Sequence, residues 1–174
     1  PSRKETTKYT LLVIGISVQG AAGAPASAPT AAAAVASHQL QLVIADNPEK
    51  VPLYRLDVSD PRMPPRPGEQ DGPSLLGPPI VLTRGESAAI GVRNLTGKPT
   101  AIHWHGIELE SYYDGVPGWT GSGGQTTPAI TPGSSFVARM TPPHSGTFIY
   151  HTHWHDETQL VNGVYGPLIV LEPG

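Results

Sequence analysis

The sequence of 174 residues contains no cysteine, which excludes disulfide bridges and any metal site that needs a thiolate ligand. It is also poor in charge. Charged residues make up 14 % of the chain, and the formal net charge of −3 leaves no basic surface for a nucleic acid. An apolar run near the start, residues 11–18, is too short to cross a bilayer as a helix. We therefore expect neither a nucleic-acid partner nor a membrane partner.

Residues 1–37 differ in composition from the rest of the chain. Three basic residues, Arg3, Lys4 and Lys8, precede the apolar run, and a tract rich in alanine and proline follows it. This order is typical of a secretory signal and predicts a secreted or periplasmic protein. The chain begins at Pro1 rather than at methionine, however, and residues 9–17 fit equally well as the last strand of a preceding domain, followed by a flexible linker. We predict an N-terminal arm that is linker or signal-like, with both possibilities open.

From residue 38 onward the sequence is typical of a turn-rich β domain, with many glycines and prolines between short stretches that alternate polar and apolar residues. Residues 60–79 predict a long irregular connection, and the one helix expected is a turn or so at 156–161. The predicted strands are residues 38–45, 54–58, 79–83, 88–93, 100–105, 135–140, 146–151 and 166–171. This spacing predicts one all-β domain over residues 38–174, most secure over 60–174, built as an antiparallel sandwich or barrel.

Five of the seven histidines fall into two compact clusters, at residues 103–105 and 151–155. His103 and His105 are separated by one residue at the end of a predicted strand, and His151 and His153 repeat that spacing after another. Side chains two apart on a strand point to the same face, so adjacent strands would bring four imidazoles into one small volume. Imidazoles without thiolate or carboxylate suit copper, zinc, iron or nickel. The pattern predicts a metal site formed by these four histidines.

The third histidine of the second cluster and the two histidines outside the clusters have weaker expectations. His155 is expected beside the metal ligands or exposed, His144 in a solvated turn, and His38 at a strand edge without a function. A ligating histidine usually needs an acceptor for its other ring nitrogen, and Asp156 or Glu157 could supply one.

The histidines belong to longer motifs that occur in a fixed order. These are His103-Trp-His-Gly106, Tyr113-Asp-Gly-Val116, Ala129-Ile-Thr-Pro-Gly-Ser-Ser-Phe136, Gly146-Thr-Phe-Ile-Tyr-His-Thr-His153 and Asn162-Gly-Val-Tyr-Gly-Pro-Leu-Ile-Val170. In order and spacing they resemble the multicopper oxidases of the laccase type. The resemblance covers roughly residues 78–174 and is weak before residue 60.

The resemblance implies a cupredoxin-like Greek-key β-sandwich or barrel that holds part of a trinuclear copper site. By position, His103 would bind the type 2 copper, and the type 3 pair would be bound by His105, His151 and His153. Such a site reduces dioxygen to water with electrons from a phenolic or similar substrate, or from a metal ion. Asp114 matches a family acid that assists proton delivery, although an Asp before a glycine is also a frequent turn residue. Gln159 matches a family position as well, with no role assigned.

One departure from the family limits what this chain can do alone. The complete set of copper ligands includes more histidines than the seven present, and the type 1 copper needs a cysteine, which is absent. The resemblance therefore implies that this chain is part of a larger assembly, in which a C-terminal cupredoxin domain or a partner chain supplies the remaining ligands. Alone, the chain is expected to show little or no oxidase activity.

Three alternatives remain from the residues alone. A cupin-like mononuclear enzyme would bind iron or manganese through His103, His105, Glu110 and one histidine of the second cluster. A non-catalytic copper-binding cupredoxin would use the same histidines without turnover. A zinc hydrolase motif at residues 151–156 has its aspartate in the wrong order.

Overall fold

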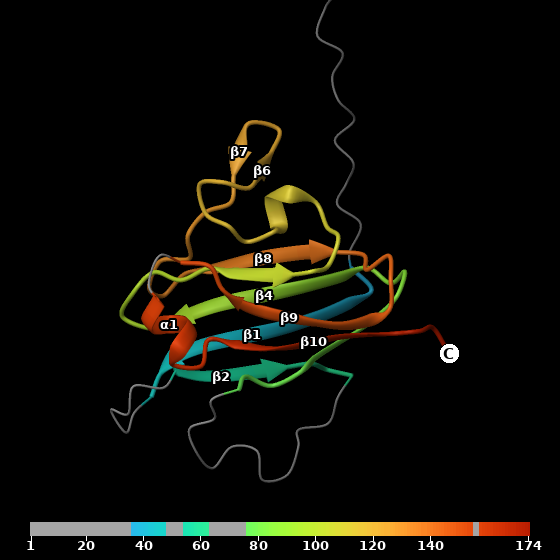
Figure 1. Ribbon diagram of the computed structural model, residues 1–174, viewed down its shortest axis with the longest axis horizontal. Coiled ribbons are helices and arrows are strands. Elements are labelled where there is room, and N and C mark those ends of the chain that lie inside the picture. Colours follow the sequence, from blue (N-terminus) through green and yellow to red (C-terminus); the bar gives the residue numbers. More distant parts are fainter. Residues whose placement is uncertain (1–35, 48–53, 63–75, 155–156) are drawn as a thin grey trace, which may run out of the picture. The chain divides into compact units, whose positions relative to one another are not determined.

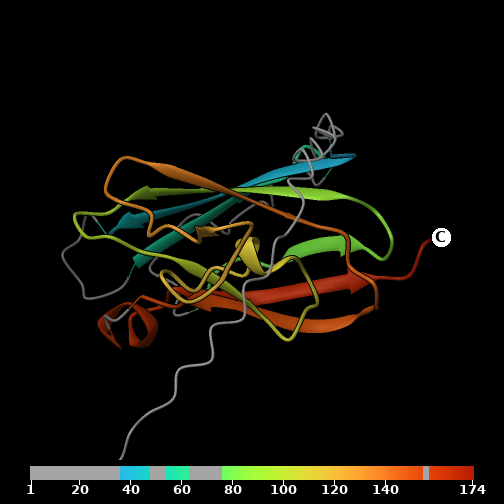
Figure 2. The ribbon, with the colours of Figure 1, turned by 90° about the horizontal axis from the view of Figure 1, so that it is seen from above.

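Two four-stranded sheets form the framework of residues 35–174 in a computed structural model, which describes residues 36–47, 54–62, 76–154 and 157–174 (Figures 1 and 2). The first sheet has the order β2-β1-β4-β8, and the second has the order β3-β10-β9-β5. The first comprises β1 (His38–Asp46), β2 (Tyr54–Ser59), β4 (Ala88–Leu95) and β8 (Ser135–Met140); the second comprises β3 (Ile80–Thr83), β5 (Ile102–His105), β9 (Gly146–Thr152) and β10 (Tyr165–Leu171). The predicted all-β sandwich is confirmed.

Three short elements complete the described part of the chain. They are the 3-10 helix η1 (Ser111–Tyr113), the two-stranded hairpin of β6 (Gly121–Ser122) and β7 (Gln125–Thr126), and helix α1 (Glu157–Val161). Helix α1 lies where a helical turn was expected, whereas η1 and the hairpin were not predicted. No helix within the described residues has the length and apolar character needed to span a bilayer. The predicted N-terminal arm lies outside the described residues, except for its last two positions.

The strand directions differ from the expected antiparallel arrangement at two places. β1 pairs with β4 in parallel, and β3 pairs with β10 in parallel, whereas the other pairs are antiparallel. The chain reaches β4 after passing through the other sheet at β3, so β4 enters the first sheet in the same direction as β1. Alternating apolar residues specify which face of a strand is buried and leave its direction to the connections.

One core lies between the facing sheets and explains the alternating pattern of the strands. In β1, Leu40, Leu42 and Ile44 point inward and are buried, while the residues between them are exposed or half-buried. The second sheet contributes Trp104 and Tyr150, which are opposite each other in the β5–β9 pair and are among the largest fully buried side chains. Each such buried side chain contributes about 1.5–3 kcal/mol relative to its exposure. The core therefore fixes the inner face of β5 and β9, and hence which of their residues face outward.

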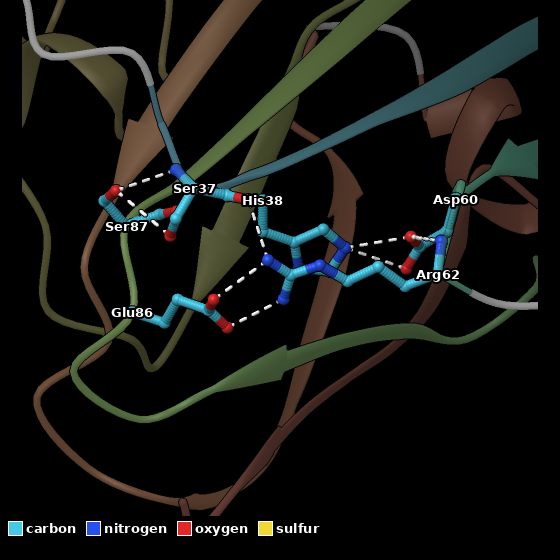
Figure 3. Close-up of polar contacts among 6 residues, drawn as sticks. All are labelled: Ser37, His38, Asp60, Arg62, Glu86 and Ser87. Carbon is cyan, nitrogen blue, oxygen red and sulfur yellow. Dashed lines mark hydrogen bonds and ion pairs between the residues drawn. The ribbon is translucent and has the colours of Figure 1, made fainter.

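A polar cluster holds the beginning of β1 at the end of the sandwich opposite α1 (Figures 1 and 3). His38 is 4 % exposed, and its Nε2 lies 2.9 Å from both carboxylate oxygens of Asp60. Arg62 donates two hydrogen bonds to Glu86, at 2.8 and 2.9 Å, and these lower the pKa of the Glu86 carboxyl to about 2. His38 is thus buried and paired at the first position of its strand, which gives it a structural role.

Candidate metal centre

Strand pairing brings the two histidine motifs together. β5 and β9 are antiparallel neighbours, and their register places His103 directly opposite His151. The chain then continues past β9 so that the backbone N–H of His153 donates to the carbonyl of Ala101 at 3.1 Å. Since Trp104 and Tyr150 occupy the inner face, the histidines of these strands lie on the outer face of the second sheet.

The four imidazoles form one cluster. The ring centroid of His103 lies 5.4 Å from that of His105, 5.3 Å from that of His151 and 5.4 Å from that of His153. The rings of His105 and His151 are 5.6 Å apart, and those of His151 and His153 are 6.0 Å apart. His105 and His153 are exposed, whereas His103 and His151 are half-buried. The cluster is therefore open to solvent on one side.

The donor set fits a transition metal. Ligand nitrogens of His103, His105 and His151 all lie within 4.8 Å of one another. Within the described ranges this is the one group of three such side chains in mutual reach, and it contains imidazoles and no carboxylate. Neutral imidazole suits copper, zinc, iron and nickel, and is a poor ligand for calcium or magnesium.

Main-chain carbonyls orient the two half-buried rings. Nδ1 of His103 lies 2.8 Å from the carbonyl oxygen of Asp114, and Nδ1 of His151 lies 2.8 Å from the carbonyl oxygen of Thr152. A carbonyl can only accept, so in each neutral ring the proton is on Nδ1 and the lone pair is on Nε2. Both rings are thereby held with Nε2 available to a metal, which is the usual arrangement of a ligating histidine.

The turn that supplies the Asp114 carbonyl depends on a glycine. Gly115 has φ +85°, a conformation that favours glycine, and it packs against the backbone of β5. A Cβ at this position would lie 1.7 Å from the carbonyl oxygen of Ile102. The close approach also brings the Asp114 carboxylate to 3.3 Å from Nδ1 of His103. The side chain of Asp114 is 24 % exposed, so the carboxylate borders both the cluster and solvent.

Burial lowers the pKa of His151 below its ordinary value of 6.5, and nearby His103, His105 and His153 lower it further. The hydrogen bond to the Thr152 carbonyl opposes this change without cancelling it. His151 is therefore neutral, and able to bind a metal, at pH values where an ordinary histidine is already protonated.

This shift predicts a pH dependence of stability for the metal-free chain. As the pH falls through 6.5, His151 is protonated in the unfolded chain before it is protonated in the fold. The free energy of unfolding should therefore fall from pH 6.5 downward until the lower folded pKa is passed, with a slope below the one-proton limit of about 1.4 kcal/mol per pH unit. Chemical unfolding of the chain and of His151→Gln, over pH 5 to 8 (about the range of histidine titration), measures this. If the free energy of unfolding had the same pH dependence in both proteins, the lowered pKa of His151 would be contradicted.

The other candidate residues lie outside the cluster or outside the described residues. His144 lies in a bend with 71 % of its side chain exposed, which agrees with the solvated position expected, and its Nε2 is 3.6 Å from Glu108. Glu110 precedes η1 and does not join the group of metal-ligating side chains. Glu157, at the start of α1, is exposed, and the acceptors seen for the histidines are carbonyls instead. His155 and Asp156 lie outside the described residues, which also leaves the zinc hydrolase motif without a described aspartate.

Known proteins resemble this chain over its C-terminal part. A family model described as multicopper oxidase matches residues 72–174, more than half of the chain. Copper resistance protein A of Pseudomonas syringae pv. tomato is 38 % identical over 96 residues, which are 55 % of this chain and 14 % of that protein. Laccase-2 of Cryptococcus neoformans var. grubii is 37 % identical over 102 residues, which are 57 % of this chain and 16 % of that protein. The chain thus spans about one seventh of the length of these relatives.

A solved structure agrees with the fold and with the family. The multi-copper oxidase from Pseudomonas thermotolerans superposes with a TM-score of 0.54 and 26 % identity, covering 77 % of this chain and 29 % of that one. The family match over residues 72–174 includes all four clustered histidines and the strands from β3 to β10, and it leaves out β1 and β2. This chain belongs to the multicopper oxidase family.

Proposed function

We propose that residues 38–174 are a cupredoxin-type domain that provides four imidazoles to a copper site where dioxygen is reduced to water. One observation carries the proposal: His103, His105, His151 and His153 gather on the outer face of one sheet, with ring centroids 5.3–6.0 Å apart along the measured pairs. The chain has no cysteine and therefore offers no thiolate ligand for a type 1 copper.

The proposal assigns the histidines to two kinds of copper site. His103 would hold a type 2 copper, and His105, His151 and His153 would hold part of a type 3 pair. Copper, when bound, would supply the one-electron chemistry that dioxygen reduction needs. The open side of the cluster supports completion of the site by a further cupredoxin domain or a partner chain, because His105 and His153 present their rings to solvent.

The residues of this domain would orient ligands and supply protons. The carbonyls of Asp114 and Thr152 hold Nδ1 of His103 and His151, so both rings present Nε2. Conversion of one dioxygen to two waters consumes four electrons and four protons. The electrons would come from a phenolic or similar substrate, or from a metal ion. The Asp114 carboxylate, which borders both solvent and His103, is the group we propose to pass protons.

A cupin-like iron or manganese site is less well supported. It needs a carboxylate from Glu110 beside His103 and His105. Among the described residues, the one group of metal-ligating side chains in mutual reach adds His151 and contains no carboxylate. A copper-binding domain without turnover uses the same ligands, and it differs only in what the rest of the protein provides.

We also propose that the protein works outside the cytoplasm, as a secreted or periplasmic protein. The basic residues and apolar run of residues 3–18 support this location.

Copper loading tests the proposal. After addition of copper and removal of unbound ions, the 174-residue chain should retain copper, show an EPR signal with nitrogen hyperfine structure, and lack the intense blue absorption of a type 1 site, because it has no cysteine. Turnover of a phenol by this chain alone should be negligible. Preference for iron, or no retention of copper, would overturn the proposal, and an intense blue band would overturn the ligand assignment.

A further inference from the structure

Gln159 is a buried polar residue beside the histidine cluster that no step of the proposed chemistry uses. It is 1 % exposed and is the buried residue of helix α1. An amide buried without partners costs about 1–3 kcal/mol, so an apolar side chain would serve simple packing better. The amide must therefore be explained by its hydrogen bonds.

The Gln159 amide connects two segments that are distant in the sequence. Its Oε1 accepts from the hydroxyl of Thr100 at 2.7 Å and from the hydroxyl of Thr152 at 3.0 Å. Its Nε2 donates to the carbonyl of Pro99 at 2.8 Å. Pro99 and Thr100 lead into β5, and Thr152 ends β9, so one side chain ties together the approaches to both histidine motifs.

Thr152 transmits this connection to the histidines. It stands between His151 and His153, and its carbonyl accepts from Nδ1 of His151. Its backbone N–H donates to Val164, whose own N–H donates to the backbone carbonyl of Gln159. The Thr152 peptide is thus fixed through its hydroxyl, its N–H and its carbonyl, and that carbonyl determines how the His151 ring is turned.

On the Thr100 side, the hydrogen bonds of Gln159 reach the backbone next to His153 and His103. The next residue, Ala101, accepts the backbone N–H of His153, and His103 lies two residues further along. The hydrogen bonds of Gln159 therefore hold the end of β9 against the beginning of β5, where the spacing between the two motifs is set.

Resting on the proposed copper site, we propose that Gln159 is a positioning residue that sets the orientation of His151 and the placement of His153 through Thr100 and Thr152. Loss of a partner that orients a ligand typically weakens metal binding 10- to 100-fold. A residue that only filled space would affect stability and leave the ligand geometry unchanged.

Gln159→Leu tests this, because it removes all three hydrogen bonds at similar volume. We expect copper affinity, measured by competition with a chelator, to fall at least about 10-fold, and the copper EPR hyperfine pattern to change. Asp60→Leu is the matched control, since it removes a buried polar partner from His38, the first residue of β1. That strand begins at the end of the sandwich opposite α1 (Figure 1). Asp60→Leu should lower the thermal unfolding temperature and leave copper affinity within about 2-fold, well below the loss expected when an orienting partner is removed.

A second measurement needs no copper. Nitrogen NMR of the imidazoles in the metal-free chain reports whether the His151 proton is on Nδ1. Gln159→Leu should change the His151 signals, and the milder Thr152→Val should change them in the same direction, which covers the case that the leucine variant does not fold. Unchanged His151 signals, or equal copper affinities for Gln159→Leu and Asp60→Leu, would overturn the proposal. Failure of the unmodified chain to bind copper would instead count against the copper site, and the NMR comparison would still decide the role of Gln159.

Discussion

Replacement of His103 by alanine should lower the copper affinity of the chain at least about 100-fold, beyond the effect of losing an orienting partner. His103 is the central ring of the cluster, because three other imidazoles lie within 5.4 Å of it. Its ring is also oriented by the Asp114 carbonyl, so the variant removes both a proposed ligand and the hydrogen bond between the turn and the cluster. The side chain is partly exposed, and the stability of the metal-free chain should change by less than about 1 kcal/mol.

Two further variants make this result specific. His153→Ala removes an exposed ring of the same cluster and should also weaken copper binding, with the fold intact. His144→Ala removes an exposed histidine outside the cluster and should bind copper like the unmodified chain. Titration with copper, followed by EPR and by circular dichroism, measures binding and fold together. Unchanged copper stoichiometry in both His103→Ala and His153→Ala would contradict the proposal that these histidines bind copper.

Replacement of Gly115 by alanine should destabilise the domain by more than about 3 kcal/mol and weaken copper binding as well. The new Cβ would meet only backbone: the carbonyl oxygen of Ile102 at 1.7 Å, its carbon at 2.6 Å and Cα of His103 at 3.1 Å. None of these atoms can move without shifting β5. The turn must therefore separate from the strand, and the Asp114 carbonyl that holds His103 moves with it.

Gly118 provides the matched comparison for this variant. Its φ of +77° resembles that of Gly115, but a Cβ there would have nothing within 4 Å. Gly118→Ala should therefore cost only the strain of the left-handed backbone, about 1–2 kcal/mol. Denaturant unfolding of both variants, with copper affinity as the second measurement, separates the cost of backbone strain from the cost of the steric clash with β5. Equal losses of stability for the two variants would show that the close approach of Gly115 to β5 has no energetic importance.

The strands and the clustering of the histidines could be predicted from local sequence patterns alone. Apolar residues such as Leu40, Leu42 and Ile44 alternate with polar ones, and this local period specifies a strand and its buried face whatever the rest of the chain does. The same period places His103 and His105 on one face. The resemblance of their flanking motifs was enough to predict the family, which the family match confirmed.

The orientation of the histidine rings and the direction of the strands depend instead on contacts between distant segments. The acceptors for His103 and His151 are carbonyls, a group that every residue possesses, so no residue type marks them in the sequence. The parallel pairing of β1 with β4 follows from a crossover between sheets, and the connections of Gln159 join residues up to 60 positions apart. Such contacts depend on which strands become neighbours, and a local pattern of polar and apolar residues does not encode that choice.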